Sequence, residues 1–446
     1  MAKSDQTPFS QVDEKLSLTQ NLSLGFQHTV IAILAAIPVP LIIASSVQMT
    51  LAQTRFFISA IIFSAGLTSI LAALNIIPRT SPQIPMIMGA SFAVVPVAIA
   101  VLNDAPSITV GFQVMAGATI VTGIFCFLIA PFWAKLQRFF PPIVVGTNLM
   151  VLGVALLPNA FHWVMDTQAN HLSTSVATKS FYLTMGVFLF HVIISKYLKG
   201  KLANISILIS LVVGTIVAYF LGMMDFSSVQ TSPWLAANLP LHYGLPKFNV
   251  EAILTFLIVM ILGMVEVSGT ATGIHNIVNK PVNRQQFGKI LKTLGLGTFF
   301  SGIFNSVQPT AFVPNVGVLD LSKNYSRFVT ATAGLMLVLI GFVPKFSALI
   351  AVIPKPVLGG IGFAIFGVII GSAVDILKQV SFKDNQNKLI IGLSIGITMI
   401  PATYPNFYAK FPSLVQNILG SGILSGALTA ILLNIFFNFK DLKSGK

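Results

Sequence analysis

The stretch PKPVLGGIGFAIFG at 354–367 follows the pattern of PPIVVGTNLMVLG at 141–153. One proline and two glycines keep their spacing and return 214 residues later each time: Pro142, Gly146 and Gly153 become Pro356, Gly360 and Gly367. A constant offset of nearly half the chain indicates two halves that fold alike.

Two further pairs of segments recur in the same order. LGFQH, which ends at His28, resembles LGMVE, which ends at Glu266, and GASF at 89–92 resembles TAF at 310–312. The three pairs fall near apolar stretches one, three and five, and again near eight, ten and twelve. Because seven is odd, the second half must enter the membrane from the opposite side. We therefore predict an inverted repeat, a common plan of secondary transporters.

Composition identifies the surroundings in which the two halves fold. Charged residues make up 9% of the 446, the hydrophobic set makes up 55%, and the mean hydropathy is +0.87. A soluble domain carries about 25% charged residues, and disorder requires low hydrophobicity, so both classes are excluded. We predict an all-α polytopic membrane protein, because lipid offers no partner to an unpaired backbone amide or carbonyl.

Fourteen apolar stretches are candidate membrane spans, in two sets of seven. The third and tenth contain Gly, Pro, Ser or Asn, so we predict that both are broken helices. The stretches lie near 24–45, 55–77, 84–102, 109–133, 140–158, 179–197, 202–222, 250–273, 287–306, 309–322, 327–350, 354–377, 387–403 and 416–438.

Charge predicts the orientation in the membrane. With both termini cytoplasmic, twenty Lys and Arg residues fall in cytoplasmic segments and six fall in outer segments, as the positive-inside rule requires. The basic residues form only small groups, so the net charge of +14 indicates contact with anionic lipid and no nucleic-acid partner. The polar N-terminus is not a secretory signal peptide. We expect a multi-pass protein of the cell membrane.

Glu266 is the acidic residue that lies well inside a long span. A charged side chain at the bilayer centre costs about 2.5–3.5 kcal/mol, so such a residue is a functional candidate. Hydrocarbon disfavours the charged form of a carboxyl, so we expect Glu266 to bind the substrate and exchange a proton. His28 is its candidate partner, and a purely structural pairing with a neighbouring helix is the alternative.

The segment NSVQPTAFVPNVGVLDLSK at 305–323 interrupts the tenth span. Pro309 and Pro314 prevent a regular helix there. A helix that begins near Asn315 would point free N–H groups at the bilayer centre, and Ser91 with Phe92 would supply the facing piece. This arrangement suits a planar, hydrogen-bonding solute, whereas ordinary helix packing is the alternative.

The tenth-span segment resembles the signature of the nucleobase–ascorbate transporters, also called the xanthine/uracil permease family. Pro314, Asn315, Gly317 and Lys323 fit that signature, while Ser322 stands where threonine is usual. The family also has a first-span QH motif, a third-span SF element, an eighth-span glutamate and a characteristic start of the twelfth span. They resemble, in this chain, Gln27–His28, Ser91–Phe92, Glu266 and PKPVLGG at 354–360.

This resemblance implies a division into a core domain and a gate domain. The core would contain spans 1–4 and 8–11, and the gate would contain spans 5–7 and 12–14. In residues, the core is 24–133 and 250–350, the gate is 134–249 and 351–439, and cytoplasmic tails lie at 1–23 and 440–446.

The resemblance also implies a function and a set of site residues. Family members import nucleobases with protons, often as homodimers, by moving the core against the gate like an elevator. Glu266 would accept hydrogen bonds from the base, and His28 would join its hydrogen-bond network and the proton coupling. The other expected contacts are stacking by Phe92, backbone contacts from Phe312, Val313 and Pro314, orientation by Asn315, and the neighbouring Ser91 and Thr270.

Departures from the family pattern leave the substrate open. Thr270 stands where relatives often carry His or Asp, and Pro314 replaces a Gln or Glu. A purine such as xanthine and the pyrimidine uracil are both candidates, and the coupling ion is a proton or sodium. An anion or bicarbonate-type transporter on the same fold, or a carrier of an ascorbate-like solute, is the alternative. The sequence contains no signature of a P-loop, a zinc protease or a serine hydrolase, so we expect no enzyme, cofactor or metal.

Overall fold

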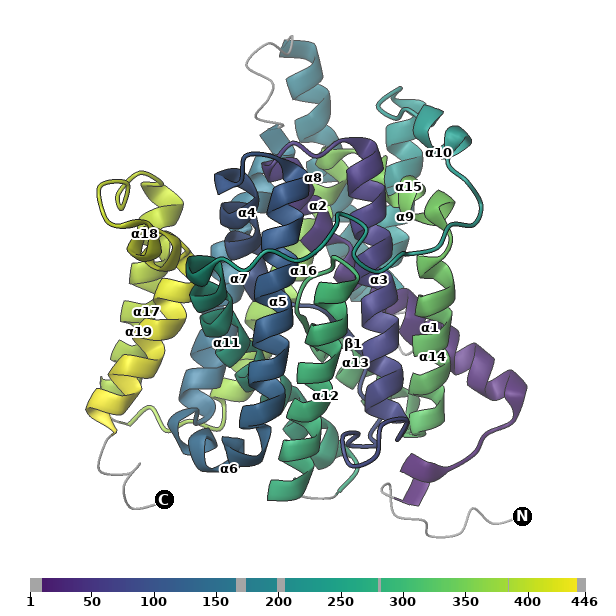
Figure 1. Ribbon diagram of the computed structural model, residues 1–446. Coiled ribbons are helices and arrows are strands. Elements are labelled where there is room, and N and C mark those ends of the chain that lie inside the picture. Colours follow the sequence, from purple (N-terminus) through teal and green to yellow (C-terminus); the bar gives the residue numbers. More distant parts are fainter. Residues whose placement is uncertain (1–9, 166–173, 199–204, 280–281, 384, 439–446) are drawn as a thin grey trace.

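The computed structural model describes residues 10–165, 174–198, 205–279, 282–383 and 385–438. Its helices form one block in which α1 begins and α19 ends on the same side (Figure 1). The first half of the chain contains η1 (Ser10–Asp13), α1 (Leu18–Ala36), α2 (Pro38–Ser46), α3 (Leu51–Ala73), β1 (Met88–Ala90), η2 (Phe92–Val94), α4 (Val95–Asp104), α5 (Ile108–Ile129), η3 (Ala130–Phe132), α6 (Trp133–Leu136), η4 (Gln137–Phe139), α7 (Pro142–Met165), α8 (Thr174–Tyr197) and α9 (Ser206–Phe220).

The second half begins with a long connection and then repeats the plan. It contains α10 (Ser227–Thr231), α11 (Val250–Ile277), α12 (Arg284–Ile303), β2 (Pro309–Ala311), α13 (Val313–Ser322), α14 (Arg327–Gly341), α15 (Pro344–Ala351), α16 (Lys355–Leu377), α17 (Asn385–Thr403), α18 (Ser413–Leu419) and α19 (Gly422–Phe437).

The polytopic all-α prediction is confirmed. Among the described residues, seven helices are long and apolar enough to cross a membrane, and nine do so if each bent pair counts as one span. Shorter or less apolar helices, α4, α9, α12, α13 and α17, occupy the other predicted stretches. The first helix begins at Leu18, several residues before the predicted span, because Ser17 and Gln20 form a capping box.

Two spans bend in places that the sequence analysis did not identify. The axes of α14 and α15 differ by 82°, and those of α18 and α19 differ by 81°. Pro344 begins α15, and Ser421 caps α19 by accepting a hydrogen bond from the Leu424 amide. A proline lacks the amide that would continue a helix, and a side-chain cap stabilises a new helix start.

The inverted repeat is visible in the way corresponding elements pair. Strands β1 and β2 pair antiparallel, with Gly89 opposite Thr310, and α7 packs along α16. Helix α3 crosses α14 at Gly66 and Gly334, and α5 crosses α12 in the same manner. Each pair joins one element from each half, as expected if a pseudo-two-fold axis relates the halves.

The helices pack in two groups. The first, which we name the α3 bundle, contains α1, α3, α5, α11, α12 and α14, and both broken spans lie against it. The second, the α7 bundle, contains α7, α8, α9, α16, α17 and α19. Contacts between the groups are fewer, and run mainly through α11 and α1.

The connection from α9 to α11 forms a strap, defined as residues 222–249, over the α3 bundle. Figure 1 shows it passing in front of α3, α12 and α5. The amide of Leu241 donates to the Ile303 carbonyl at 2.7 Å, and the Asn238 side chain donates to the Gly341 carbonyl at 2.9 Å. The ring of His242 stacks on Phe56 with centroids 4.0 Å apart. Burial lowers the pKa of His242, so its neutral form is favoured in this stack.

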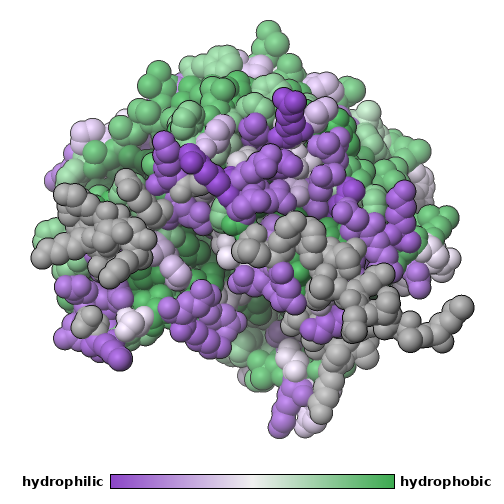
Figure 2. Space-filling model, turned by 90° about the horizontal axis from the view of Figure 1, so that it is seen from below, coloured by the Kyte–Doolittle hydropathy of each residue, from purple (hydrophilic) through white to green (hydrophobic). Residues whose placement is uncertain are grey.

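The side from which α1 begins and α19 ends is polar. Figure 2 shows hydrophilic side chains gathered on this face, with hydrophobic ones crowded along its upper rim in that view. Basic residues lie at helix ends on this side, as Lys135 of α6 and Lys378 after α16 show. An apolar belt with polar caps is the surface that a bilayer requires.

Candidate functional site

The two broken spans meet at the centre of the molecule through backbone hydrogen bonds. The amide of Phe312 donates to the Ile87 carbonyl, and the amide of Ser91 donates to the Gln308 carbonyl, both at 3.0 Å. The helices α4 and α13 start directly after this strand pair. Pairing in this way satisfies irregular backbone that the membrane interior would otherwise leave without partners.

Gly89 of β1 lies where the strand contacts the ring of Phe312, and only glycine fits there. A Cβ atom at this position would overlap the ring of Phe312. The absence of a side chain at Gly89 therefore leaves room for the ring of Phe312 against the strand.

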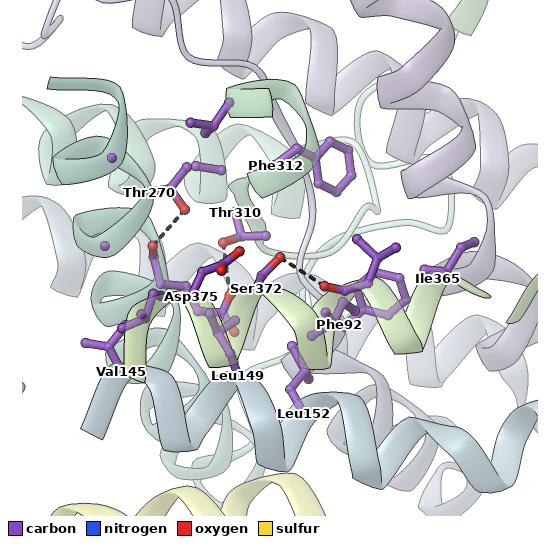
Figure 3. Close-up of a pocket in the computed structure, with 18 of the residues that line it drawn as sticks. Phe92, Val145, Leu149, Leu152, Thr270, Thr310, Phe312, Ile365, Ser372 and Asp375 are labelled. Atoms are coloured by element: carbon purple, nitrogen blue, oxygen red, sulfur yellow. Dashed lines mark hydrogen bonds between the residues drawn. The ribbon is translucent and has the colours of Figure 1, made fainter. Parts of the chain in front are cut away.

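A cavity of about 290 Å³ lies between the two bundles, beside the strand pair. This volume is at the lower end for small-molecule sites. One wall comes from α1, the broken spans and α11: Ile31, Phe92, Glu266, Gly269, Thr270, Gly273, Thr310, Ala311, Phe312 and Val316. The facing wall comes from α7, α9 and α16, with Val145, Leu149, Leu152, Ile207, Ile365, Val368, Ile369, Ser372, Asp375 and Ile376 (Figure 3).

Glu266 reaches the cavity from the middle of α11. Its Oε2 atom accepts a hydrogen bond of 3.0 Å from the Thr310 hydroxyl on β2. The ion pairs of the described residues, Arg327–Asp13 and Lys378–Asp375, do not include it. One carboxylate oxygen is therefore held in place, while the group retains capacity to accept hydrogen bonds from a ligand.

Thr310 is a site residue that the sequence analysis missed. It lies in the TAF segment that was noted as a repeat, but its role depends on the antiparallel register that places it across from α11. A hydroxyl followed two residues later by an aromatic residue is too common a pattern to identify such a contact from the sequence.

Thr270 also lines the cavity, one turn after Glu266. Its hydroxyl donates to the Glu266 backbone carbonyl at 3.0 Å. This bond occupies its proton, so the oxygen remains available only as an acceptor. Thr270 therefore adds a weak polar group to the wall and carries no charge.

Two aromatic rings from the broken spans border the same cavity. Phe92 and Phe312 are both buried and both line it. Phe92 contacts Phe366 of α16 edge-on, with centroids 6.1 Å apart. Aromatic faces at this position offer stacking area to a planar ligand.

His28 and Asn315 lie behind the wall as a hydrogen-bonded pair. The Nδ1 atom of His28 and the Oδ1 atom of Asn315 are 3.1 Å apart, and each residue is 3% exposed. An amide oxygen only accepts, so this contact places the proton on Nδ1. Neither side chain is among those that line the cavity. The pair joins α1 to α13 and holds the broken span in position.

The remaining predicted site residues are Ser91, Val313 and Pro314. Ser91 caps η2 by accepting a hydrogen bond from the Ala93 amide at 3.3 Å, and it is fully buried. Val313 and Pro314 form the start of α13, and their side chains lie outside the described part of the structure. The side chain of Asp320, an acid in the same span, also lies outside it.

The α16 wall contributes two polar residues that the sequence analysis did not include in the site. Ser372 and Asp375 both line the cavity, and Figure 3 shows them on the helix that faces Thr310. Asp375 sits near a span end, where an acid is unremarkable, so its position in a cavity follows only from the packing of α16 against the α3 bundle.

The cavity is open to solvent at one end. The side chain of Asp375 is 72% exposed, so the cavity reaches solvent beside the last turn of α16. On the opposite side, the Asn417 amide of α18 donates to Glu251 Oε1 of α11 at 3.0 Å. This bond joins α18, which directly precedes α19 of the α7 bundle, to α11 of the α3 bundle at a place outside the cavity lining.

The lining contains no Lys or Arg among the described residues. It has two carboxyl groups, three hydroxyl groups and two phenyl rings on an otherwise apolar surface. Within the same described ranges, no three His, Cys, Asp or Glu side chains converge as a metal site would require. Such a cavity favours a flat solute that donates hydrogen bonds, and it offers no cationic partner to a compact oxyanion such as sulfate or bicarbonate.

Comparison with known sequences gives consistent matches over nearly the whole chain. Residues 19–407 match the profile of the xanthine/uracil permeases, described as a permease family. The uric acid permease PucK of Bacillus subtilis is 33% identical over 97% of this chain and 98% of its own. The uric acid transporter UacT of Escherichia coli K12 is 30% identical over 97% and 89%, and a Bacillus subtilis xanthine permease is 30% identical over 94% of both chains.

Solved structures share the fold at low sequence identity. The transmembrane domain of the cyanobacterial bicarbonate transporter BicA superimposes with a TM-score of 0.62 at 16% identity, covering 95% of this chain and 99% of that domain. The anion transporter SLC26A9 gives a TM-score of 0.61 at 14% identity, over 94% of this chain and 65% of the other. These matches bear on the architecture alone.

Proposed function

We propose that this chain, which belongs to the xanthine/uracil permease family, carries oxopurine bases such as xanthine or urate across the cell membrane. Its membership makes it a transporter and not an enzyme. The observation that carries the proposal is the carboxyl group of Glu266, held by Thr310 in a cavity lined by no basic residue of the described chain.

Glu266 is the principal ligand of the base in this proposal. Ring N–H groups donate to its carboxylate, while Phe92 and Phe312 provide apolar faces for the ring. Backbone groups at Phe312, Val313 and Pro314 would supply further contacts. His28 and Asn315 keep α1 and α13 in register, so they act on the base through the position of the broken span.

Transport by this chain would follow an elevator motion. We assign the α3 bundle to the core and the α7 bundle to the gate, with the cavity between them. The state described here opens beside Asp375, on the side where α1 begins. The excess of basic residues predicted for that side makes it the cytoplasmic one, so this is an inward-open arrangement. Assembly as a homodimer is part of the same proposal.

Proton symport would supply the driving force, with Glu266 as the exchanging group. Once the base is bound, a low-dielectric site without a cationic partner would favour uptake of a proton by this carboxylate, so that the base and the proton cross together. One charge that crosses 100 mV provides about 2.3 kcal/mol, and about 1.4 kcal/mol corresponds to a tenfold gradient. For a neutral base such as xanthine, one proton therefore supports accumulation on the order of fifty-fold.

Uptake of radiolabelled xanthine and urate in a transport-deficient host tests this proposal. We expect Glu266→Ala to abolish saturable uptake and Glu266→Gln to reduce it strongly, while a protonophore removes accumulation in the wild type. Glu14→Gln is the matched control, because Glu14 is exposed and far from the cavity in sequence and structure. Wild-type rates in Glu266→Ala would refute the role of the carboxyl group.

Competition distinguishes a base carrier from an anion carrier on the same fold. An excess of unlabelled xanthine or uracil should inhibit uptake, whereas sulfate and bicarbonate should not, because the cavity presents carboxyl groups and no described basic side chain. Inhibition by bicarbonate alone would favour the anion carrier.

A further inference from the structure

We propose that Ser372 and Asp375 on α16 determine substrate specificity. They would accept hydrogen bonds from one edge of a two-ring base whose opposite edge is bound by Glu266. This inference rests on the proposed function and names the substrate class: bicyclic oxopurines with N–H groups on both rings, in preference to uracil. Neither residue was expected in the site from the sequence.

The polar groups of the wall that faces Glu266 are confined to one helix, and this helix is where a second hydrogen-bonding contact with the base can form. The α7 and α9 part of the facing wall is wholly apolar, with Val145, Leu149, Leu152 and Ile207. Its polar groups come from α16 alone. Ser372 and Asp375 are three residues apart, so they lie on one face of the helix, and both line the cavity.

Both residues present acceptors to the cavity. The Ser372 hydroxyl donates its proton to the Val368 carbonyl at 3.0 Å, which leaves its lone pairs. Asp375 receives Lys378 Nζ on Oδ1 at 2.7 Å, and among the described residues Oδ2 accepts no hydrogen bond. The α16 wall therefore has acceptor capacity but no free donor.

The opposite wall presents acceptors as well. Glu266 offers its carboxylate, and the Thr270 hydroxyl has already donated its proton to a backbone carbonyl. A ligand that satisfies both walls must carry donors on two separate edges. Xanthine and urate have N–H groups on the pyrimidine ring and on the imidazole ring, whereas uracil has a single ring and cannot extend donors as far.

The contact on α16 belongs to one conformational state. Ser372 and Asp375 are on the α7 bundle, while Glu266 is on the α3 bundle. A base that touches both is held across the interface in the state that opens beside Asp375. Selection between one-ring and two-ring bases would therefore occur when the base is bound between the bundles.

Equilibrium binding to the purified full-length protein tests this assignment. Dissociation constants for xanthine, urate and uracil are measured by calorimetry for the wild type, Asp375→Asn and Ser372→Ala. We expect Asp375→Asn to weaken xanthine and urate about tenfold, which is about 1.4 kcal/mol, and to leave uracil within twofold. Ser372→Ala should shift the same bases in the same direction by a smaller factor.

Lys378→Ala is the matched control, because it removes the partner of Asp375 without removing a cavity acceptor. It should keep wild-type affinities for all three bases. Equal xanthine affinities in Asp375→Asn and the wild type would overturn the inference. An equal loss of affinity for uracil and xanthine in Asp375→Asn would also overturn it, and so would the same loss of xanthine affinity in Lys378→Ala. A wild type that binds none of these bases would instead refute the proposed function. Both α16 positions face the cavity or solvent, so melting temperatures should stay unchanged.

Discussion

Thr310 shows how a single hydroxyl prepares the binding carboxylate. Its 3.0 Å hydrogen bond fixes Oε2 of Glu266, so the other carboxylate oxygen is directed by the same contact. The bond crosses from β2 to α11, two elements that are joined only by way of α12 in the chain. Ordering of the carboxylate before the base arrives reduces the entropy that binding must offset.

Replacement of Thr310 by valine keeps the shape and removes the hydrogen bond. A hydrogen bond to a charged group contributes roughly 1.5–3 kcal/mol, so we expect the xanthine affinity of Thr310→Val to fall about tenfold or more. Thr310→Ser retains the hydroxyl and should stay within a fewfold of the wild type. Calorimetric titration of the three proteins measures this, and equal affinities for valine and serine variants would contradict it.

Gly89 is the second residue whose local geometry decides the site. A Cβ there would overlap the Phe312 ring, so Gly89→Ala should displace that ring from the cavity wall and abolish saturable xanthine uptake. Gly317→Ala is the matched control, because nothing lies within 4 Å of a Cβ built on Gly317. We expect normal uptake for the control, and normal uptake for Gly89→Ala would show that the ring is not needed where it lies.

At the scale of secondary-structure elements, the close approach of two helix pairs requires glycine. At the α3–α14 crossing, Gly66 would place a Cβ 2.5 Å from the Gly334 carbonyl oxygen, and at the α5–α12 crossing Gly123 would place one 2.5 Å from the Phe299 amide nitrogen. The neighbour is backbone in both cases, and backbone cannot move aside as a flexible side chain can. Small residues let membrane helices approach closely enough for van der Waals packing.

Valine at these crossings should destabilise the protein without changing its charge. Overpacking costs about 1–3 kcal/mol, so we expect Gly66→Val and Gly123→Val to lower the melting temperature in detergent by several degrees. Gly392→Val is the control, because Gly392 is exposed on α17 and has nothing within 4 Å of its built Cβ. A control that melts as early as the two crossing variants would show that valine itself, and not the close contact, is responsible.

Some elements follow from the sequence and others do not, for physical reasons. Pro309 and Pro314 reveal the broken tenth span because a proline ring excludes a regular helix wherever it occurs. Glu266 stands out because an acid in hydrocarbon is costly wherever the helix packs. Thr310, Ser372 and Asp375 are ordinary in their local sequence, and their roles arise only when distant segments pack together. The bend before α19 depends on a serine cap and two glycines, which also occur in straight membrane helices.

At the scale of the whole molecule, the cavity is a cleft between two bundles that is open to solvent beside Asp375. A hydrogen bond from Asn417 to Glu251 lies on the other side, near enough to Asp104 for the two carboxyl groups to interact electrostatically. The strap covers that region of the α3 bundle and is fixed to it by backbone bonds. An elevator would have to break the Asn417 contact. The strap, which the predicted boundaries assign to the gate, would then move with the α3 bundle to which it is bonded.

Cysteine labelling measures the accessibility of the two sides. The protein has one cysteine, Cys126, which is buried, so Cys126→Ala provides a cysteine-free background. Ser372→Cys should react with an impermeant maleimide in inside-out vesicles and be protected by xanthine, because Ser372 lines the cavity. Gln230→Cys, on exposed α10, should react in right-side-out vesicles only. Labelling of both from the same side would contradict the proposed orientation.

The strand pair β1–β2 has a consequence for how the protein is made. Met88 to Ala90 pair with Pro309 to Ala311, which the ribosome delivers more than two hundred residues later. Until then, the third span has a stretch of backbone with unsatisfied amides and carbonyls, and the carboxylate of Glu266 has no threonine to hold it. A nascent chain halted before β2 would therefore contain Glu266 but lack the binding pocket. The unpaired backbone groups of its third span would depend on the insertion machinery for shielding from lipid.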